Sequence, residues 1–194
     1  MTAGCIVGIN AANMLTVVAL ASFLVVVAGV NYPERKPELG VYQDEEKCFP
    51  YTGTWYAKYR NFERDPYFGG TAKCVRCTHH EDFKNGSHVH LVEVGSSKVD
   101  IKVTPVSSEG YAHKNVLRVS LLDHEEIEIN ASVVYVDCNV CKILRHPYIS
   151  KTACSVLVPA TQVHKGGTVC DFIYDLLCGS QKYQIYDDSC KSHR

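Results

Sequence analysis

Polar and apolar residues alternate with a period of two over most of the chain after Tyr51. In residues 98–103, Val99, Ile101 and Val103 fall on one face, and polar residues separate them. This alternation is typical of a strand with one buried face. Further runs that favour strands begin around Trp55 and continue at residues 71–78, 88–94, 115–122, 126–129, 132–136, 141–144 and 153–158.

Turn-forming residues separate these runs. They include Asn85-Gly86, Gly95-Ser-Ser97, Asp123-His124 and the stretch 107–110. Short strands with turns between them, at a spacing of about ten residues, predict an antiparallel sandwich or barrel. A closed up-and-down barrel also leaves no exposed edge strand, which favours it for a secreted monomer. We therefore expect an all-β fold, an eight-stranded antiparallel up-and-down barrel.

The period changes near the C-terminal end of the sequence. The pattern predicts one helix over residues 167–178, with Gly166-Gly-Thr168 at its start and Gly179 at its end. Its expected apolar stripe consists of Phe172, Ile173, Leu176 and Leu177. A strand-like tail, residues 183–186, then leads to Cys190.

The first 33 residues contain no charged side chain. Within them, residues 14–28 form a compact apolar run that ends in small residues. This pattern predicts a signal peptide over residues 1–29. Met14 is an alternative translation start, and a membrane anchor is the alternative interpretation of the apolar run. Residues 30–50 are then a polar lead-in, and residues 51–194 are the folded domain, including the helix and the tail.

The cysteine content and the net charge indicate the compartment in which the protein acts and the kinds of partner that it binds. Nine of the ten cysteines follow Ala28, a number that favours an oxidising compartment and a disulfide framework. Asn85 and Asn130 each begin a glycosylation sequon. The net charge is −1 and no block of Lys or Arg occurs, so we expect no nucleic-acid partner and, after cleavage of the leader, no membrane partner. We expect an extracellular monomer.

Two CxxC pairs, Cys74–Cys77 and Cys138–Cys141, lie near several histidines and raise the question of a zinc site. Residues three apart on a strand point to opposite faces, so neither pair converges on one ion. We therefore expect no metal and no cofactor. We find no nucleophile elbow, no paired carboxylates and no Cys/His dyad in the sequence, so we do not expect an enzyme.

A set of motifs in a fixed order identifies a family resemblance. Gly53-Thr-Trp55 resembles the Gly-x-Trp signature of lipocalins, and residues 65–69 followed by Cys74-Val75 resemble the segment after the first strand of tick histamine-binding lipocalins. Later matches are residues 135–137, 141–144, 154–157, 170–174, 178–179 and 185–190. The chain thus resembles the salivary lipocalins of ticks over about residues 48–190. The resemblance implies a ligand cavity inside the barrel.

The resemblance also implies a disulfide framework. Its pairs are Cys74–Cys190, Cys141–Cys154 and Cys48–Cys170, with Cys141–Cys170 as the alternative found in some relatives. Cys77, Cys138 and Cys178 are then left over. Because nine is an odd number, at least one cysteine is free or forms an intermolecular bond.

The resemblance implies the ligand-binding residues as well. Asp65 matches the acid of amine-binding relatives, with an Asp-Pro turn as its alternative role, and Phe62 and Phe68 replace two larger aromatic residues. Ile101 and Ser155 stand where relatives carry acids. If no bulge intervenes in the strand after Asn130, Tyr135 and Asp137 face inward, and Asp137 is then a second acid or else a turn residue. Tyr59 and Val119 complete the expected lining.

The predicted function is sequestration of a small host mediator, either a biogenic amine such as histamine or a lipid such as a leukotriene or sterol. A buried ammonium requires carboxylate partners, and only Asp65 is a well-matched acid. The alternative is an immunomodulator that binds a host protein through the barrel surface and loops.

Overall fold

The computed structural model describes residues 32–192 except residues 52 and 83, so the predicted signal peptide lies outside the described residues. The strands are β1 (Thr54–Arg60), β2 (Val75–Asp82), β3 (His88–Val94), β4 (Ser97–Val106), β5 (Val116–Leu121), β6 (His124–Asp137), β7 (Cys141–Arg145), β8 (Cys154–Pro159) and β9 (Tyr183–Gln184). The helices are α2 (Val169–Cys178) and the short 3₁₀ segments η1 (Pro37–Tyr42), η2 (Glu45–Cys48), η3 (Lys84–Gly86), η4 (Ala160–Gln162) and η5 (Asp188–Ser192).

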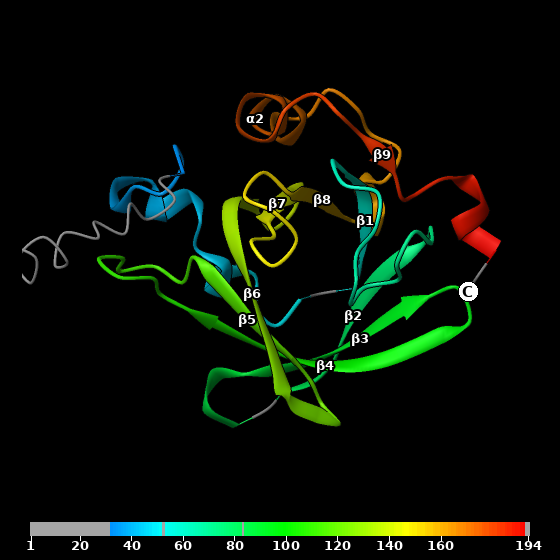
Figure 1. Cartoon of the computed structure of the whole chain (residues 1–194), viewed down its shortest axis with the longest axis horizontal. Coiled ribbons are helices and arrows are strands. Elements are labelled where there is room, and N and C mark those ends of the chain that lie inside the picture. Colours follow the sequence, from blue (N-terminus) through cyan, green and yellow to red (C-terminus); the bar gives the residue numbers. More distant parts are fainter. Residues whose placement is uncertain (1–31, 52, 83, 193–194) are drawn as a thin grey trace, which may run out of the picture. The chain divides into compact units, whose positions relative to one another are not determined.

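The sheet closes into the expected antiparallel barrel (Figure 1). Each strand from β2 to β7 pairs with the next strand in the sequence, and β1 pairs with both β8 and β2. The contact between β1 and β2 covers only residues 54–56 of β1, and β9 pairs with β1 further along, at Tyr59 and Arg60. The prediction of an eight-stranded up-and-down barrel is confirmed.

Of the four register shifts among the described strand pairs, two change which of the expected lining residues face the interior. The pairing of β1 with β8 shifts between Ala57 and Tyr59, and the pairing of β6 with β7 shifts between Val133 and Tyr135. A bulge adds one residue to a strand and so reverses the inward and outward positions beyond it. Strand β6 also runs unbroken over the two short runs expected at residues 126–129 and 132–136.

Apolar side chains pack on both sides of the wall. The inner cluster includes Ile101, Val103, Val119 and Ala131, whereas Val134, Ile143 and Val156 belong to an outer cluster beneath α2. The expectation for Val99 was wrong, because it is 37% exposed next to the β3–β4 turn although it shares the face of Ile101.

Helix α2 packs on the outer surface of β7 and β8 (Figure 1). The Asp171 carboxylate accepts hydrogen bonds from the backbone N–H and the hydroxyl of Thr168 (2.8 and 3.0 Å), which stabilises the first turn. Cys170, Tyr174 and Cys178 form the buried face. Among the described residues, no helix has the length and apolar character needed to cross a bilayer.

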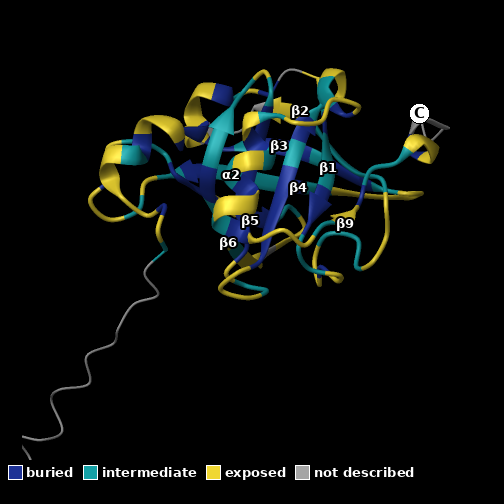
Figure 2. Cartoon of the chain, turned by 90° about the horizontal axis from the view of Figure 1, so that it is seen from above, coloured by how far each residue is buried: buried dark blue, intermediate teal, exposed yellow. Residues whose placement is uncertain are grey.

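The predicted apolar stripe of α2 is wrong in two positions. Phe172 and Leu176 are each 69% exposed, while Ile173 and Leu177 pack against the outer cluster. The buried face is centred on Tyr174 and the two cysteines, so the helix turns the other two apolar residues outward. Figure 2 shows the exposed residues along this helix.

Four disulfides cross-link the described part of the chain, and two expected pairs are corrected. Cys74–Cys190 is present as expected. Cys48 pairs with Cys138 rather than Cys170, because both lie at the same end of the barrel. Helix α2 instead carries two bonds to the wall, Cys141–Cys170, which was the alternative, and Cys154–Cys178 in place of Cys141–Cys154.

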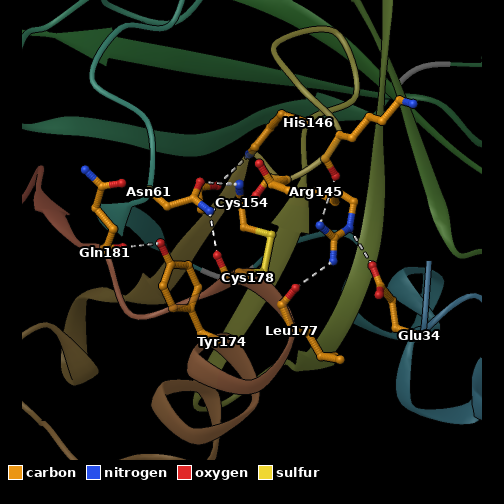
Figure 3. Close-up of a disulfide and its surroundings, with 12 residues drawn as sticks. Glu34, Asn61, Arg145, His146, Cys154, Tyr174, Leu177, Cys178 and Gln181 are labelled. Atoms are coloured by element: carbon orange, nitrogen blue, oxygen red, sulfur yellow. Dashed lines mark hydrogen bonds and ion pairs between the residues drawn. A yellow bond between two sulfur atoms is a disulfide. The ribbon is translucent and has the colours of Figure 1, made fainter. Parts of the chain in front are cut away.

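An N-terminal arm, residues 32–48, is held against the barrel wall. The Arg145 Nε–H donates to Glu34 Oε1 (2.5 Å) and its Nη2 donates to the carbonyl of Leu177 in α2 (3.2 Å), as Figure 3 shows. The Gln43 amide donates to the Glu34 carbonyl (2.8 Å). One buried arginine therefore links the arm, strand β7 and the helix.

Candidate functional site

The barrel encloses a cavity of about 130 Å³. Its walls are mainly apolar side chains of successive strands, namely Ala57, Val75, Val92, Ile101, Val103, Leu117, Val119, Ile129, Ala131, Leu144 and Leu157. Polar side chains gather at its two ends. We call the end beside connections 61–74 and 146–153 the loop end, and the end beside Trp55 the closed end.

Asp65 lies at the loop end and is buried. Its Oδ1 accepts hydrogen bonds from the backbone N–H groups of Tyr67 and Phe68 (3.0 Å each). Its Oδ2 accepts the hydroxyl of Tyr148 (3.2 Å), and burial next to Asp65 raises the pKa of that hydroxyl. The carboxylate thus organises the turn that follows β1, as Asp-Pro turns do.

Arg60 also lines the loop end, because the β1 bulge directs it inward. It is 4% exposed. Its Nη2 donates to the carbonyls of Glu63 (2.8 Å) and Gly70 (2.5 Å), and its guanidinium carbon lies 4.9 Å from the Phe62 ring centre. Burial lowers the pKa of the guanidinium, and the nearby charge of Asp65 partly offsets this.

His146 and Ser155 complete the loop end. The His146 Nε2 and the Ser155 hydroxyl are 2.7 Å apart, and the His146 ring meets Phe62 edge to face at 5.5 Å. Burial, together with the charges of Arg60 and Arg145, lowers the pKa of His146 to about 3. The imidazole is therefore neutral at physiological pH.

A buried ion pair lies at the closed end. The Lys142 ammonium donates to Glu45 Oε1 (2.5 Å) and to the Tyr51 hydroxyl, which also bonds Glu45. The ammonium lies 3.6 Å from the Tyr51 ring centre and 4.7 Å from that of Trp55. Burial lowers the pKa of Lys142, and Glu45 opposes this effect. Trp55 packs with Cys48 and Tyr51 and also lines the cavity.

Cys77 is the free cysteine among the described residues. It faces the cavity, and its Sγ lies 3.5 Å from His90 Nδ1. Burial raises the thiol pKa to about 12 and lowers the His90 pKa to about 3. The thiol is therefore protonated and the imidazole neutral, which is the opposite of an activated Cys/His dyad.

The expected lining residues divide into two groups. Those that the structure places in the cavity are Phe62, Asp65, Phe68, Ile101, Val119 and Ser155. Tyr59 instead lies under α2, and its hydroxyl donates to Asp171 (2.6 Å). Tyr135 packs on the outer cluster, and Asp137 accepts the Asn139 N–H in the β6–β7 turn (3.0 Å). The two bulges explain these corrections.

Sequence reasoning did not include the basic side chains among the expected lining residues, although Lys142 stands where many amine-binding relatives carry an acid. The alternation predicts that Arg60 faces inward only if the β1 bulge is known, and nothing in the sequence marks that bulge. Lys142 had a signal, since it stands two positions before Leu144 in a strand of otherwise mostly apolar residues. His146 and Tyr148 lie on a connection where periodicity carries no information.

Three further expectations concern the surface and metals. Asn85 and Asn130 are both exposed, so glycosylation at either stays a prediction. Cys74, Cys138 and Cys141 are held in disulfides. Within residues 32–192 as described, no three His, Cys, Asp or Glu side chains are grouped to hold a metal ion.

Two solved structures are similar at low identity. Apocrustacyanin C2 shares 16% identity over 73% of this chain and 81% of its own, with a TM-score of 0.46. Insecticyanin from the tobacco hornworm Manduca sexta shares 14% identity over 72% of this chain and 80% of its own, with a TM-score of 0.47. No curated protein matches the chain.

The sequence matches one protein family over most of its length. The model of that family, described as tick histamine binding protein, matches residues 33–192. This span contains every strand of the barrel, helix α2 and all four disulfides. The chain therefore belongs to the tick histamine-binding protein family, with the lipocalin fold.

Proposed function

We propose that this protein is secreted in tick saliva and sequesters a small host mediator inside its barrel. The observation that supports this most directly is the cavity itself, with apolar walls and a few buried polar groups at its ends. Binding sites for small molecules commonly have this composition, because apolar walls supply affinity and placed polar groups supply orientation. A carrier of this kind lowers the free mediator concentration by mass action, without turnover.

The volume of the cavity limits the size of the mediator that it can hold. A dry apolar cavity of about 150 Å³ in another protein accepts benzene, and the cavity here is about 130 Å³. A ligand with a single ring therefore fits better than a sterol or a leukotriene. Among the mediators that the family resemblance implies, the size favours the small ones.

The disulfides support the secreted state. Four such bonds in one domain are typical of proteins that fold in an oxidising compartment. The proposed role in suppressing host inflammation and haemostasis depends on this export. Secretion is tested by expressing the full chain in insect cells and sequencing the N-terminus of the exported protein. A chain that stays in the membrane fraction would contradict the proposal.

Ligand retention is tested by native mass spectrometry and calorimetric titration of the oxidised protein. Ala131→Phe fills the cavity, because Ala131 faces inward on β6. Glu128→Phe, on the same strand but exposed, is the matched control. We expect the first change to remove small-molecule binding and the second to leave it intact. Equal binding by both variants would place the ligand outside the barrel.

A protein partner is the second candidate function, and one observation favours it. Val169, Phe172 and Leu176 lie at spacings of three and four residues on α2 and are 45%, 69% and 69% exposed. Exposed apolar groups on a helix face often mark contact sites. Recovery of a defined plasma protein by the native protein, lost in the double variant Phe172→Ser with Leu176→Ser, would support this role.

A further inference from the structure

The charged groups of the cavity do not match an amine. Two cations, Arg60 and Lys142, line it, against one carboxylate, Asp65. A buried ammonium requires a carboxylate that is free to bind it. An entering amine would meet a cation at each end of the barrel, so the balance of charge opposes it.

The Asp65 carboxylate is poorly available to an amine, because it already accepts three hydrogen bonds. Two backbone N–H groups occupy Oδ1, and the Tyr148 hydroxyl occupies Oδ2. The donors also hold the turn after β1, so displacing them would disturb the wall of the cavity. The acid expected to bind an amine is thus already committed to the fold.

Glu45 is similarly committed at the closed end. Its Oε1 accepts both the Lys142 ammonium and the Tyr51 hydroxyl, and Glu45 is fully buried behind them. Lys142 and Tyr51 line the cavity, but Glu45 does not. An approaching ligand therefore meets the ammonium and the rings before it meets the carboxylate.

Arg60, in contrast, has a donor to spare. Within the described part of the chain, both hydrogen bonds of its guanidinium use Nη2, and its buried Nε has no hydrogen-bond partner. His146 Nδ1, on the same end of the cavity, is also buried without a partner there. An unpaired buried donor on a charged group is costly, and a ligand that carries an acceptor would satisfy it.

We propose that the cavity binds a small aromatic carboxylic acid, with its carboxylate on the Arg60 guanidinium and its ring between Phe62, Phe68 and the apolar wall. This inference rests on the proposed function and names the ligand class of the same cavity. A single ring is the size that about 130 Å³ accepts. Arginine is well suited to the carboxylate, because the guanidinium adds charge to the hydrogen bond.

The test compares three ligands of nearly equal shape on the native, oxidised protein. These are phenylacetate, its neutral amide phenylacetamide, and phenethylamine, with histamine as a fourth probe. Trp55, the one tryptophan of the sequence, lines the cavity, so its fluorescence reports occupancy alongside calorimetry. We expect the acid to bind at least tenfold more tightly than the amide, and the amines to bind more weakly than both.

Two variants separate Arg60 from a general effect of charge. Arg60→Gln should reduce the affinity for phenylacetate at least tenfold and leave that for the amide nearly unchanged. Lys73→Gln removes an exposed cation, paired with Asp187, from the same connection, and should change neither affinity. If Arg60→Gln does not fold, the comparison of acid with amide in the native protein still decides the inference.

The outcomes distinguish this inference from the proposed function. Tighter binding of an amine than of the acid would overturn the acid but leave a small-molecule carrier in place. Equal binding of acid and amide would also overturn it, since Arg60 would then have no part in recognition. If no probe binds and no ligand is retained in native mass spectrometry, both the inference and the carrier function fail.

Discussion

At the scale of single residues, the hydrogen bonds that a side chain already makes determine which role it can take. Asp65 was expected to be either a ligand acid or a turn former, and its three donors support the turn. The sequence allowed both roles because the pattern Asp-Pro is common to both. The Tyr148 hydroxyl that completes the set is 83 residues away, beyond the reach of any local pattern.

Removing the Asp65 carboxylate should therefore destabilise the fold. Asp65→Ala leaves three donors without an acceptor in a buried turn, at a cost of about 2–3 kcal/mol in the free energy of unfolding. Urea denaturation measures this. Glu63→Ala, an exposed carboxylate two residues earlier, is the control and should cost much less. Equal costs for the two variants would contradict the structural role of Asp65.

The Lys142–Glu45 pair makes a second prediction at this scale. Glu45→Gln leaves a fully buried ammonium without its counter-charge, which should cost about 3–5 kcal/mol. Adding Lys142→Met to that variant should recover most of the loss, because the unpaired charge is then gone. Glu128→Gln, which breaks the exposed pair with Arg118, should cost under about 1 kcal/mol. No recovery in the double variant would show that the pair stabilises the fold in itself.

At the scale of elements, periodicity identified the strands but not their bulges. The alternation through β3, β4 and β5 correctly placed Ile101, Val103 and Val119 inside. It failed beyond the bulges in β1 and β6, at Tyr59 and Tyr135, because one added residue reverses the faces without changing the pattern of residue types. The arginine that the bulge turns inward is the cation on which the ligand inference depends.

The two bonds from α2 to the barrel give a prediction for the helix. Cys154–Cys178 closes a loop of 24 residues, for which the loss of chain entropy on unfolding is about 3 kcal/mol. The double variant Cys154→Ser with Cys178→Ser should lose about that much stability. Partial proteolysis and disulfide mapping by mass spectrometry should still find Cys141–Cys170 intact. Recovery of a Cys141–Cys154 bond from the native protein would contradict the pairing described above.

At the scale of the whole molecule, the family resemblance predicted the fold well and the chemistry poorly. Strand order depends on turn positions and alternation, which a sequence displays along its length. The cavity depends on side chains from six or more strands and connections, and on which of them are already bonded to one another. Arg60 and Lys142 outnumber Asp65 along the cavity, so its lining carries a positive charge even though His90 and His146 are neutral, whereas the chain as a whole has a net charge of −1.

The buried imidazoles should make the stability of the protein fall between pH 7 and pH 5. Burial, Lys142, His79 and His88 hold the pKa of His90 near 3, and burial with Arg60 and Arg145 does the same for His146. In the unfolded chain each histidine regains a pKa of about 6.5. Below that value the unfolded state binds protons that the folded state does not, so stability declines by about 1 kcal/mol per pH unit for each imidazole.

His90→Gln should remove one of these contributions and reduce the decline by about half, as urea titrations at the two pH values would measure. His124→Gln, at an exposed position, should leave the decline unchanged. A decline that is the same in both variants would mean that His90 already binds a proton in the folded barrel, and that the cavity carries more positive charge than the neutral imidazole implies.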